Sequence, residues 1–183
     1  MSLIGARESQ QLTEQTRKKL RPFILTAIII VADQIVKALI VATIPLNTVG
    51  FSALSGFLRI IHARNLGIAF SIGGGAPGGF RGIFFMALPL VVLALLVVFY
   101  FRSNELTTLQ RWAITGILGG GLGNLIDRLF RSHGVVDFID VKFYGLFGLD
   151  RWPTFNIADA SVVVCGLLLL FSVLIQSGKG KNE

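Results

Sequence analysis

Several carboxylates and amides that lie in or beside apolar runs are the side chains in this sequence best suited to chemistry, and the carboxylates are Asp33, Asp127, Asp137 and Asp159. Asp137 lies in the segment 134–140 with apolar residues on both sides, and Asp159 follows Asn156 by three positions. Two carboxyl groups brought together cannot both ionise, so they share a proton. The ionised member of such a pair can take a proton from water while the protonated member polarises a carbonyl. That is the chemistry of peptide hydrolysis without a metal or a covalent intermediate.

A second set of polar residues interrupts apolar runs, where each charge is costly. Asp33 and Lys37 are four residues apart on one face of a predicted helix. They either neutralise one another or belong to a site, and the spacing leaves both readings open. Asn124, Asp127 and Arg128 share a face of a later helix. The two charged residues there are typical of membrane-interface anchors, whereas Asn124 lies deeper.

Several other positions have structural explanations of their own. Asn156 precedes an apolar run and is a typical helix N-cap. Gly116 with Gly120, and Gly119 with Gly123, have the spacing that lets helices approach closely. These glycines indicate helix packing.

Other catalytic classes lack the residues they need. His62 and His133 lie in separate loops without an HExxH helix, so a zinc protease has no ligand set. Cys165 is the single cysteine and lies inside an apolar run, which excludes a disulfide framework. Neither a serine-hydrolase turn nor a phosphate-binding or dinucleotide fingerprint occurs. We therefore expect no metal and no cofactor.

Four apolar runs must position these side chains, and each is near the ~20 residues that cross a bilayer. They cover residues 23–46, 82–101, 112–130 and 155–175. Of the 183 residues, 53% are hydrophobic and 15% are charged, at a mean hydropathy of +0.73. So few charges cannot cover a soluble globule of this size. The sequence predicts an all-α membrane protein with four transmembrane helices.

The basic residues indicate how the chain is oriented. The net charge is +7, but Lys and Arg flank the apolar runs, which favours an anionic membrane surface over nucleic acid as the partner. Placing both termini in the cytoplasm puts nine Lys and Arg inside and seven outside, on longer segments. We predict a basic cytoplasmic tail at 1–22, a four-span domain at 23–175 and a cytoplasmic tail at 176–183.

The two predicted outer segments are more than linkers. Residues 57–71 are rich in β-branched and aromatic residues and predict one or two short strands. The glycine-rich stretch 73–79 predicts a flexible connector without regular structure. Residues 135–149 predict a strand followed by an interfacial amphipathic piece.

Five motifs in order connect these observations over nearly the whole chain. They are Asp33-Gln34-x-x-Lys37, Asn65-Leu66-Gly67-Ile68-Ala69-Phe70-Ser71, Gly119-Gly120-x-x-Gly123-Asn124-Leu125-Ile126-Asp127-Arg128, Val135-Val136-Asp137-Phe138-Ile139-Asp140 and Phe155-Asn156-Ile157-Ala158-Asp159. Each motif alone is weak, but together they resemble the lipoprotein signal peptidases (signal peptidase II), the membrane aspartyl proteases of bacteria.

The resemblance implies roles for individual residues. Asp137 and Asp159 would be the catalytic dyad. Residues that shape the site or bind substrate would be Asp33, Lys37, Asn65, Gly120, Asn124, Asp127, Arg128 and Asn156. The substrate would be a prolipoprotein whose lipobox cysteine carries a diacylglyceryl group, cleaved just before that cysteine. The fold would add a small extracytoplasmic β-cradle and a mobile outer loop to four helices.

Two other classes compete with this reading. Intramembrane Asp, Lys and Asn sets also mark proton- or ion-coupled transporters and small channels. However, four spans without an inverted repeat, and polar residues clustered at one face, speak against a transport path. A scaffold with interfacial anchors is the third class. We expect a multi-pass monomer of the bacterial inner membrane, with its active site near the extracytoplasmic face and with membrane lipids as further partners.

Overall fold

The computed structural model describes residues 14–66 and 78–179, and for residues 78–85 and 178–179 the course of the backbone only. Its long helices are α2 (Phe23–Thr43), α3 (Gly78–Arg102), α4 (Thr108–Phe130) and α5 (Ile157–Lys179). A further helical stretch, residues 14–20, precedes α2 across a turn. The four predicted runs are therefore helical, with bounds that differ from the prediction by a few residues.

Local sequence explains where the helices begin and end. Pro22 stands at the N-cap of α2, where its missing N–H is no loss. Thr107 and Gln110 form a reciprocal capping box at the start of α4. The backbone leaves helical geometry at Ile44, directly before Pro45, which disfavours helix in the preceding residue.

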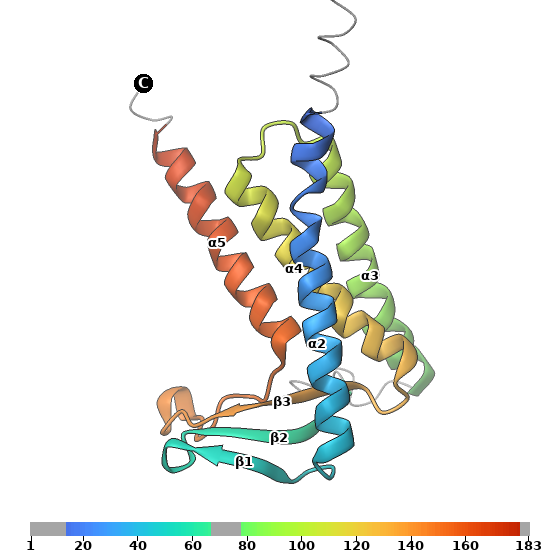
Figure 1. Ribbon diagram of the computed structural model, residues 1–183, viewed down its shortest axis with the longest axis vertical. Coiled ribbons are helices and arrows are strands. Elements are labelled where there is room, and N and C mark those ends of the chain that lie inside the picture. The colour runs from blue at the N-terminus through green and yellow to red at the C-terminus, as the bar shows by residue number, and fades with distance from the viewer. Residues whose placement is uncertain (1–13, 67–77, 180–183) are drawn as a thin grey trace, which may run out of the picture.

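Helix α4 is the central helix and packs against α2, α3 and α5 (Figure 1). Its glycines make this possible, as their spacing predicted. A Cβ on Gly120 would collide with the Ala158 carbonyl of α5, and one on Gly119 would crowd the Thr26 backbone of α2. Between the same helices, Thr26 Oγ1 donates to the Thr115 carbonyl at 2.7 Å. These helices therefore pack through close contact of their backbones, where larger side chains would not fit.

A three-stranded antiparallel sheet of order β1-β2-β3 lies at one end of the helices (Figure 1). The strands are β1 (Val49–Ala53), β2 (Leu58–Asn65) and β3 (Val135–Val141). Strands β2 and β3 confirm the predicted ones, whereas β1 was not predicted. An apolar cluster of Ile40, Val136 and Phe138 attaches the sheet to α2.

Two predictions about the outer segments need comment. Gly78 and Gly79 begin α3, so the glycine-rich stretch is not wholly irregular as predicted. Residues 73–77 of that stretch, residues 67–71 of the predicted strand region and the chain ends 1–13 and 180–183 lie outside the described residues. After β3 the chain forms a short 3-10 turn at Leu146–Gly148.

Among the described residues, two helices are long and apolar enough to cross a membrane: Glu14–Thr43 and Ile157–Ser177. A shorter apolar stretch covers Met86–Arg102 of α3. Large apolar side chains are exposed along α2, α3 and α5, whereas most of the middle of α4 is buried by its neighbours. Helix α4 therefore carries glycines and polar groups where the outer helices carry Leu, Val and Phe.

Candidate active site

Asp159 is held in place by the first turn of α5. The Asn156 side chain accepts a hydrogen bond from the Asp159 backbone N–H at 2.9 Å, as an N-cap does. In return, the Asp159 carboxylate accepts from the Asn156 backbone N–H at 3.2 Å. The two residues form a capping box, with aspartate in the place of the usual glutamate. The predicted N-cap is confirmed, and it fixes the Asp159 backbone and side chain together.

Asp137 lies in the middle of β3 and is 2% exposed. It pairs with Ala63 of β2, next to an irregularity in the register between Ile60 and Ala63. On the other side of β3, the segment before α5 forms a bridge between Ile139 and Phe155. This bridge brings the start of α5 beside the middle of β3 (Figure 1).

Asn156 joins the two aspartates. Its Nδ2 lies 2.7 Å from Asp137 Oδ1, and its Oδ1 is already occupied by the Asp159 backbone N–H. The cap therefore decides the orientation of the amide, because only the nitrogen end remains to face Asp137. Asn156 itself is completely buried. Asp137 and Asp159 are two of the carboxylates expected to converge, and the structure brings both into contact with one asparagine.

Lys37 lies at the centre of a buried charge cluster behind this pair. Its Nζ is 2.7 Å from Asp33 Oδ2 and 3.0 Å from Asp127 Oδ2, and all three side chains are 0% exposed. The predicted Asp33–Lys37 pair is thus confirmed, and it belongs to a larger cluster. Asp127 is not an interfacial anchor, because it is buried between helices.

Each carboxylate of the cluster also orients a neighbouring backbone. Asp33 Oδ1 accepts from the Ala158 N–H in the first turn of α5 at 3.0 Å. Asp127 Oδ2 accepts from the Val136 N–H, one residue before Asp137, at 3.0 Å. A buried ion pair gains little unless its remaining lone pairs are satisfied. Here those lone pairs are used to position the two segments that carry the aspartate pair.

Asn124 connects the cluster to Asp159. Its Oδ1 accepts from Lys37 Nζ at 2.9 Å, and its Nδ2 donates to Asp159 Oδ1 at 2.7 Å. Asp159 thus receives one side-chain donor and one backbone donor, while remaining partly exposed. Both of its carboxyl oxygens therefore accept hydrogen bonds from donors that neighbouring residues hold in place.

Asp137 differs from Asp159 in its surroundings. Burial and, after it, the negative charge of Asp159 raise the pKa of the Asp137 carboxyl to about 6. Hydrogen bonds from the Asn65 and Asn156 side chains act in the opposite direction. Asp137 is therefore suited to hold the shared proton at mildly acidic pH.

The remaining predicted site residues fall into two groups. Asn65 ends β2 opposite Val135 and contacts Asp137, and Gly120 lets α4 reach the first turn of α5. Arg128 is half-buried, but it makes no hydrogen bond or ion pair within residues 14–66 and 78–179. The structure does not bring Arg128 into the charge cluster.

Sequence reasoning missed two members of the cluster. Gln34 Nε2 donates to Asp127 Oδ1 at 3.1 Å and to the Gly123 carbonyl at 3.0 Å. Arg131 pairs with Asp127 Oδ1 at 3.0 Å, four residues further along. The i, i+4 spacing of Asp127 and Arg131 was a signal that could have found this contact.

The arrangement suits acid–base chemistry on a water molecule. The partly exposed Asp159 accepts hydrogen bonds from fixed donors. Beside it, the buried Asp137 carboxyl group keeps its proton to a higher pH than an ordinary aspartate, because its pKa is raised. No group of three or more His, Cys, Asp or Glu within the described part of the chain is arranged to hold a metal ion. The carboxyl groups of Asp137 and Asp159 are the titratable groups that share Asn156 in this part of the structure.

Comparison with known proteins identifies the family of this chain. The family model for signal peptidase (SPase) II matches residues 25–175. The lipoprotein signal peptidase of Treponema pallidum is 47% identical over 91% of this chain and 89% of its own length. That of Treponema denticola is 49% identical over 88% of this chain and 92% of its own.

A solved structure is also similar to this chain. A bacterial membrane enzyme determined by the in meso method at 1.9 Å resolution has a TM-score of 0.71 and 31% identity. The match covers 84% of this chain and 92% of that one. The chain therefore belongs to the signal peptidase II family, the peptidases that remove signal peptides from prolipoproteins.

Proposed function

We propose that Asp137 and Asp159 are the catalytic pair of this lipoprotein signal peptidase. The observation that carries the proposal is the shared contact of both residues with Asn156, at 2.7 Å to Asp137 and 2.9 and 3.2 Å to Asp159. One rigid residue thereby holds two carboxyl groups of different environment at one place. Such a difference assigns separate acid and base roles to paired carboxyl groups.

The reaction then proceeds without a covalent intermediate. Asp159 takes a proton from a water molecule, and the oxygen of that water forms a bond to the carbonyl carbon of the scissile peptide. Protonated Asp137 donates a hydrogen bond to the carbonyl oxygen and stabilises the developing charge. Asp159 passes its proton to the leaving nitrogen as the C–N bond breaks. The products are a carboxylate on the signal peptide and a free amine on the mature protein.

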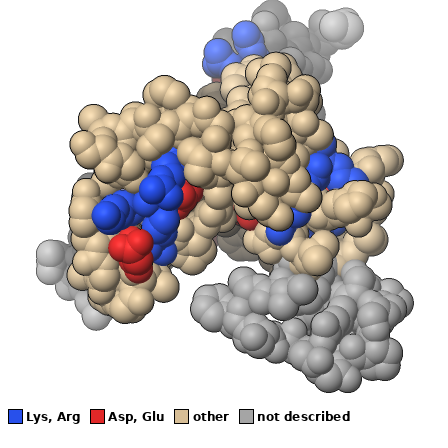
Figure 2. Space-filling view, turned by 90° about the horizontal axis from the view of Figure 1, so that it is seen from below, with Lys and Arg blue, Asp and Glu red and all other residues tan. Residues whose placement is uncertain are grey.

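We place all four helices across the membrane, with both described ends on the cytoplasmic side and the sheet outside. The supporting features are the exposed apolar side chains of α2, α3 and α5 and the position of the sheet at the end opposite the termini (Figure 1). Figure 2 views the sheet end and shows Lys and Arg side chains gathered on it. Polar ends flanking an apolar middle are typical of an inner-membrane protein. A single chain contains both aspartates, so a monomer suffices for catalysis.

The proposed substrate is a prolipoprotein whose cysteine carries a diacylglyceryl group, with the cut just before that cysteine. The aspartate pair lies where the sheet meets the helices, at one end of the apolar part of the molecule. Acyl chains of a substrate could remain in the bilayer while the peptide reaches this level. The transporter alternative fits less well, because the buried charges cluster at one end and the family match is to a peptidase.

Cleavage of a lipidated precursor by the purified protein tests the assignment. Asp137→Asn and Asp159→Asn should each remove nearly all activity, because a reacting pair fails as a unit. Asp150→Asn, an exposed aspartate at the same end of the molecule, is the matched control and should keep its activity. Near wild-type processing by either dyad variant would overturn the catalytic assignment.

A further inference from the structure

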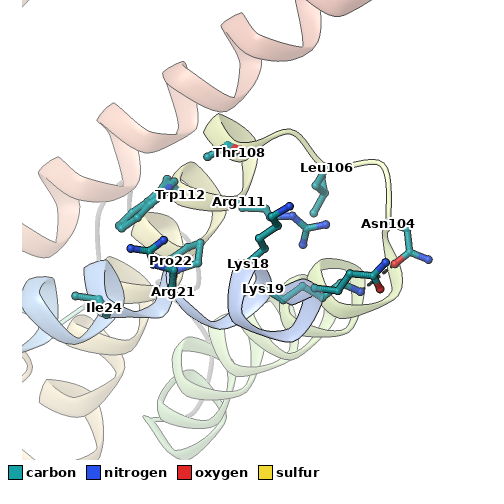
Figure 3. A pocket seen from close by; sticks show the side chains of 11 residues that line it. Lys18, Lys19, Arg21, Pro22, Ile24, Asn104, Leu106, Thr108, Arg111 and Trp112 are labelled. Atoms are coloured by element: carbon teal, nitrogen blue, oxygen red, sulfur yellow. Dashed lines mark hydrogen bonds between the residues drawn. The ribbon is translucent and has the colours of Figure 1, made fainter. Parts of the chain in front are cut away.

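A cavity lies at the end of the molecule opposite the sheet, far from the aspartate pair. Its volume is about 820 Å³. Figure 3 shows its walls, which come from the segment before α2, the connection between α3 and α4, and the first turns of α4. This volume falls in the range of sites that bind small molecules.

The charge of this cavity has a single sign. Lys18, Lys19, Arg21 and Arg111 line it, and none of the described residues that line it is acidic (Figure 3). The ion pairs of the described residues involve other cations. Four like charges at one cavity repel one another, so an anion bound there would stabilise them.

Arg111 provides the most specific sign of a ligand. Its side chain is 9% exposed and lies over the Tyr100 ring, 5.4 Å from the ring centre. Nη2 donates to the Ser103 carbonyl at 3.3 Å, whereas Nη1 is buried without a hydrogen-bond partner. A buried donor without an acceptor is costly, and a phosphate oxygen is the acceptor that a guanidinium binds best.

The start of α4 adds to this positive potential. Thr108, Arg111 and Trp112 line the cavity from the first turns of a 23-residue helix. A helix N-terminus carries partial positive charge and favours anions. Trp112 is partly exposed, and Trp is enriched at the level of lipid headgroups.

The walls of the cavity are tied together before any ligand binds. Tyr100 donates through its hydroxyl to the Lys19 carbonyl at 2.7 Å, and Lys19 Nζ lies 2.9 Å from Asn104 Oδ1. These contacts join the segment before α2 to α3 and to the loop that follows it. The site is therefore built largely from positioned groups, which lowers the entropic cost of binding.

We propose that this cavity binds the phosphate group of an anionic membrane lipid in the leaflet opposite the active site. The inference rests on the membrane orientation proposed above, because that orientation places the cavity at a headgroup level. Basic pockets between helices on the cytoplasmic side are a recurrent way of binding anionic headgroups. The neighbouring apolar surface of Ile24 offers a path for the acyl chains.

Native mass spectrometry of the full chain released from nanodiscs tests the proposal, with phosphatidylglycerol compared against phosphatidylcholine. The wild type should retain phosphatidylglycerol selectively. Lys18→Gln/Arg21→Gln and, separately, Arg111→Gln should each lower that retention roughly tenfold or more. Arg17→Gln/Arg102→Gln removes the same charge from exposed positions at the same end, outside the cavity lining, and should retain the lipid.

Three results would overturn the inference. Equal loss in cavity and control variants would mean diffuse attraction to the surface. Equal retention of both lipids by the wild type would mean that the cavity does not select a lipid with a net negative headgroup. Displacement of the lipid by millimolar inorganic phosphate would mean a site for the free ion. Because the measurement requires no peptide cleavage, its failure would leave the peptidase assignment untouched, and loss of cleavage would leave this inference untouched.

Discussion

Lys37 Nζ lies 2.9 Å from Asn124 Oδ1, and this contact determines which end of the Asn124 amide faces Asp159. An ammonium group only donates, so the oxygen of the amide must turn toward Lys37. The nitrogen is then left to donate to Asp159 Oδ1 at 2.7 Å. A buried cation that touches neither member of the dyad thus controls the donor on one of them.

Asn124→Asp tests the hydrogen-bonded chain from Lys37 through Asn124 to Asp159, with almost no change in side-chain shape. The variant replaces a donor to Asp159 by a second acceptor, which repels a carboxylate base. We expect kcat to fall about 10- to 100-fold, as is common when a group that orients a reacting side chain is lost. Steady-state kinetics on a lipidated precursor measure the effect. Unchanged kcat in a folded variant would show that Asn124 does not orient Asp159.

Lys37→Met should destabilise the protein strongly. It leaves the buried carboxylates Asp33 and Asp127 without their shared cation, and breaking a buried pair from one side costs about 3–5 kcal/mol. Thermal unfolding in a neutral detergent measures the loss. Arg128→Met removes a cation that makes no ion pair within the described residues, so it is the matched control and should change the unfolding temperature little. Equal effects of the two substitutions would contradict the role given to Lys37.

Asp137→Asn should stabilise the protein above pH 6 while removing activity. The pKa of Asp137 is raised to about 6, so ionisation at higher pH opposes the folded state. Below the ordinary value of 3.8 the carboxyl group is neutral in both states, and no difference remains. The gain should therefore grow between about pH 4 and 6 and level off at up to about 3 kcal/mol. Unfolding temperatures of wild type and variant across this range provide the test, with Asp150→Asn expected to show no such trend.

The same raised pKa predicts the alkaline limb of the activity profile. In the proposed mechanism Asp137 must carry a proton, so kcat/KM should fall about tenfold per pH unit above about pH 6. A bound substrate excludes water and favours the neutral acid further, so the limb of kcat should lie at higher pH. Rates that rise steadily into alkaline pH, or that fall on adding a chelator, would indicate another mechanism.

Much of the site could be predicted because its spacing is local. Asp33 and Lys37 are one helical turn apart, and Asn156 precedes Asp159 at the spacing of a capping box, so sequence alone relates each pair. The glycines of α4 likewise predicted close helix packing. Patterns of this kind depend on a few neighbouring residues and do not depend on tertiary contacts.

Other features depend on tertiary contacts that no local pattern encodes. Strand β1 has only five residues, includes Gly50 and Ser52, which have low strand propensity or little side chain to pack, and has mostly exposed side chains. It is recognisable only from its pairing with β2. Arg128 and Arg131 are both close to Asp127 in sequence at the end of α4. Only the tertiary structure shows that Arg131, and not Arg128, pairs with Asp127.

The lipid part of the substrate should contribute to turnover as well as to affinity. The aspartate pair lies beside the junction of sheet and helices, so acyl chains held in the bilayer would anchor the peptide against it. Each buried CH₂ contributes about 0.8 kcal/mol at a point remote from the reacting carbonyl. Such remote binding energy can align the scissile bond with Asp159 and Asp137, and its loss lowers kcat together with apparent affinity.

An unlipidated precursor of identical peptide sequence should therefore be cleaved far more slowly, even at saturating concentration. Parallel assays of both precursors in bilayers measure the difference, and equal kcat values would reject lipid anchoring while leaving the aspartate chemistry in place.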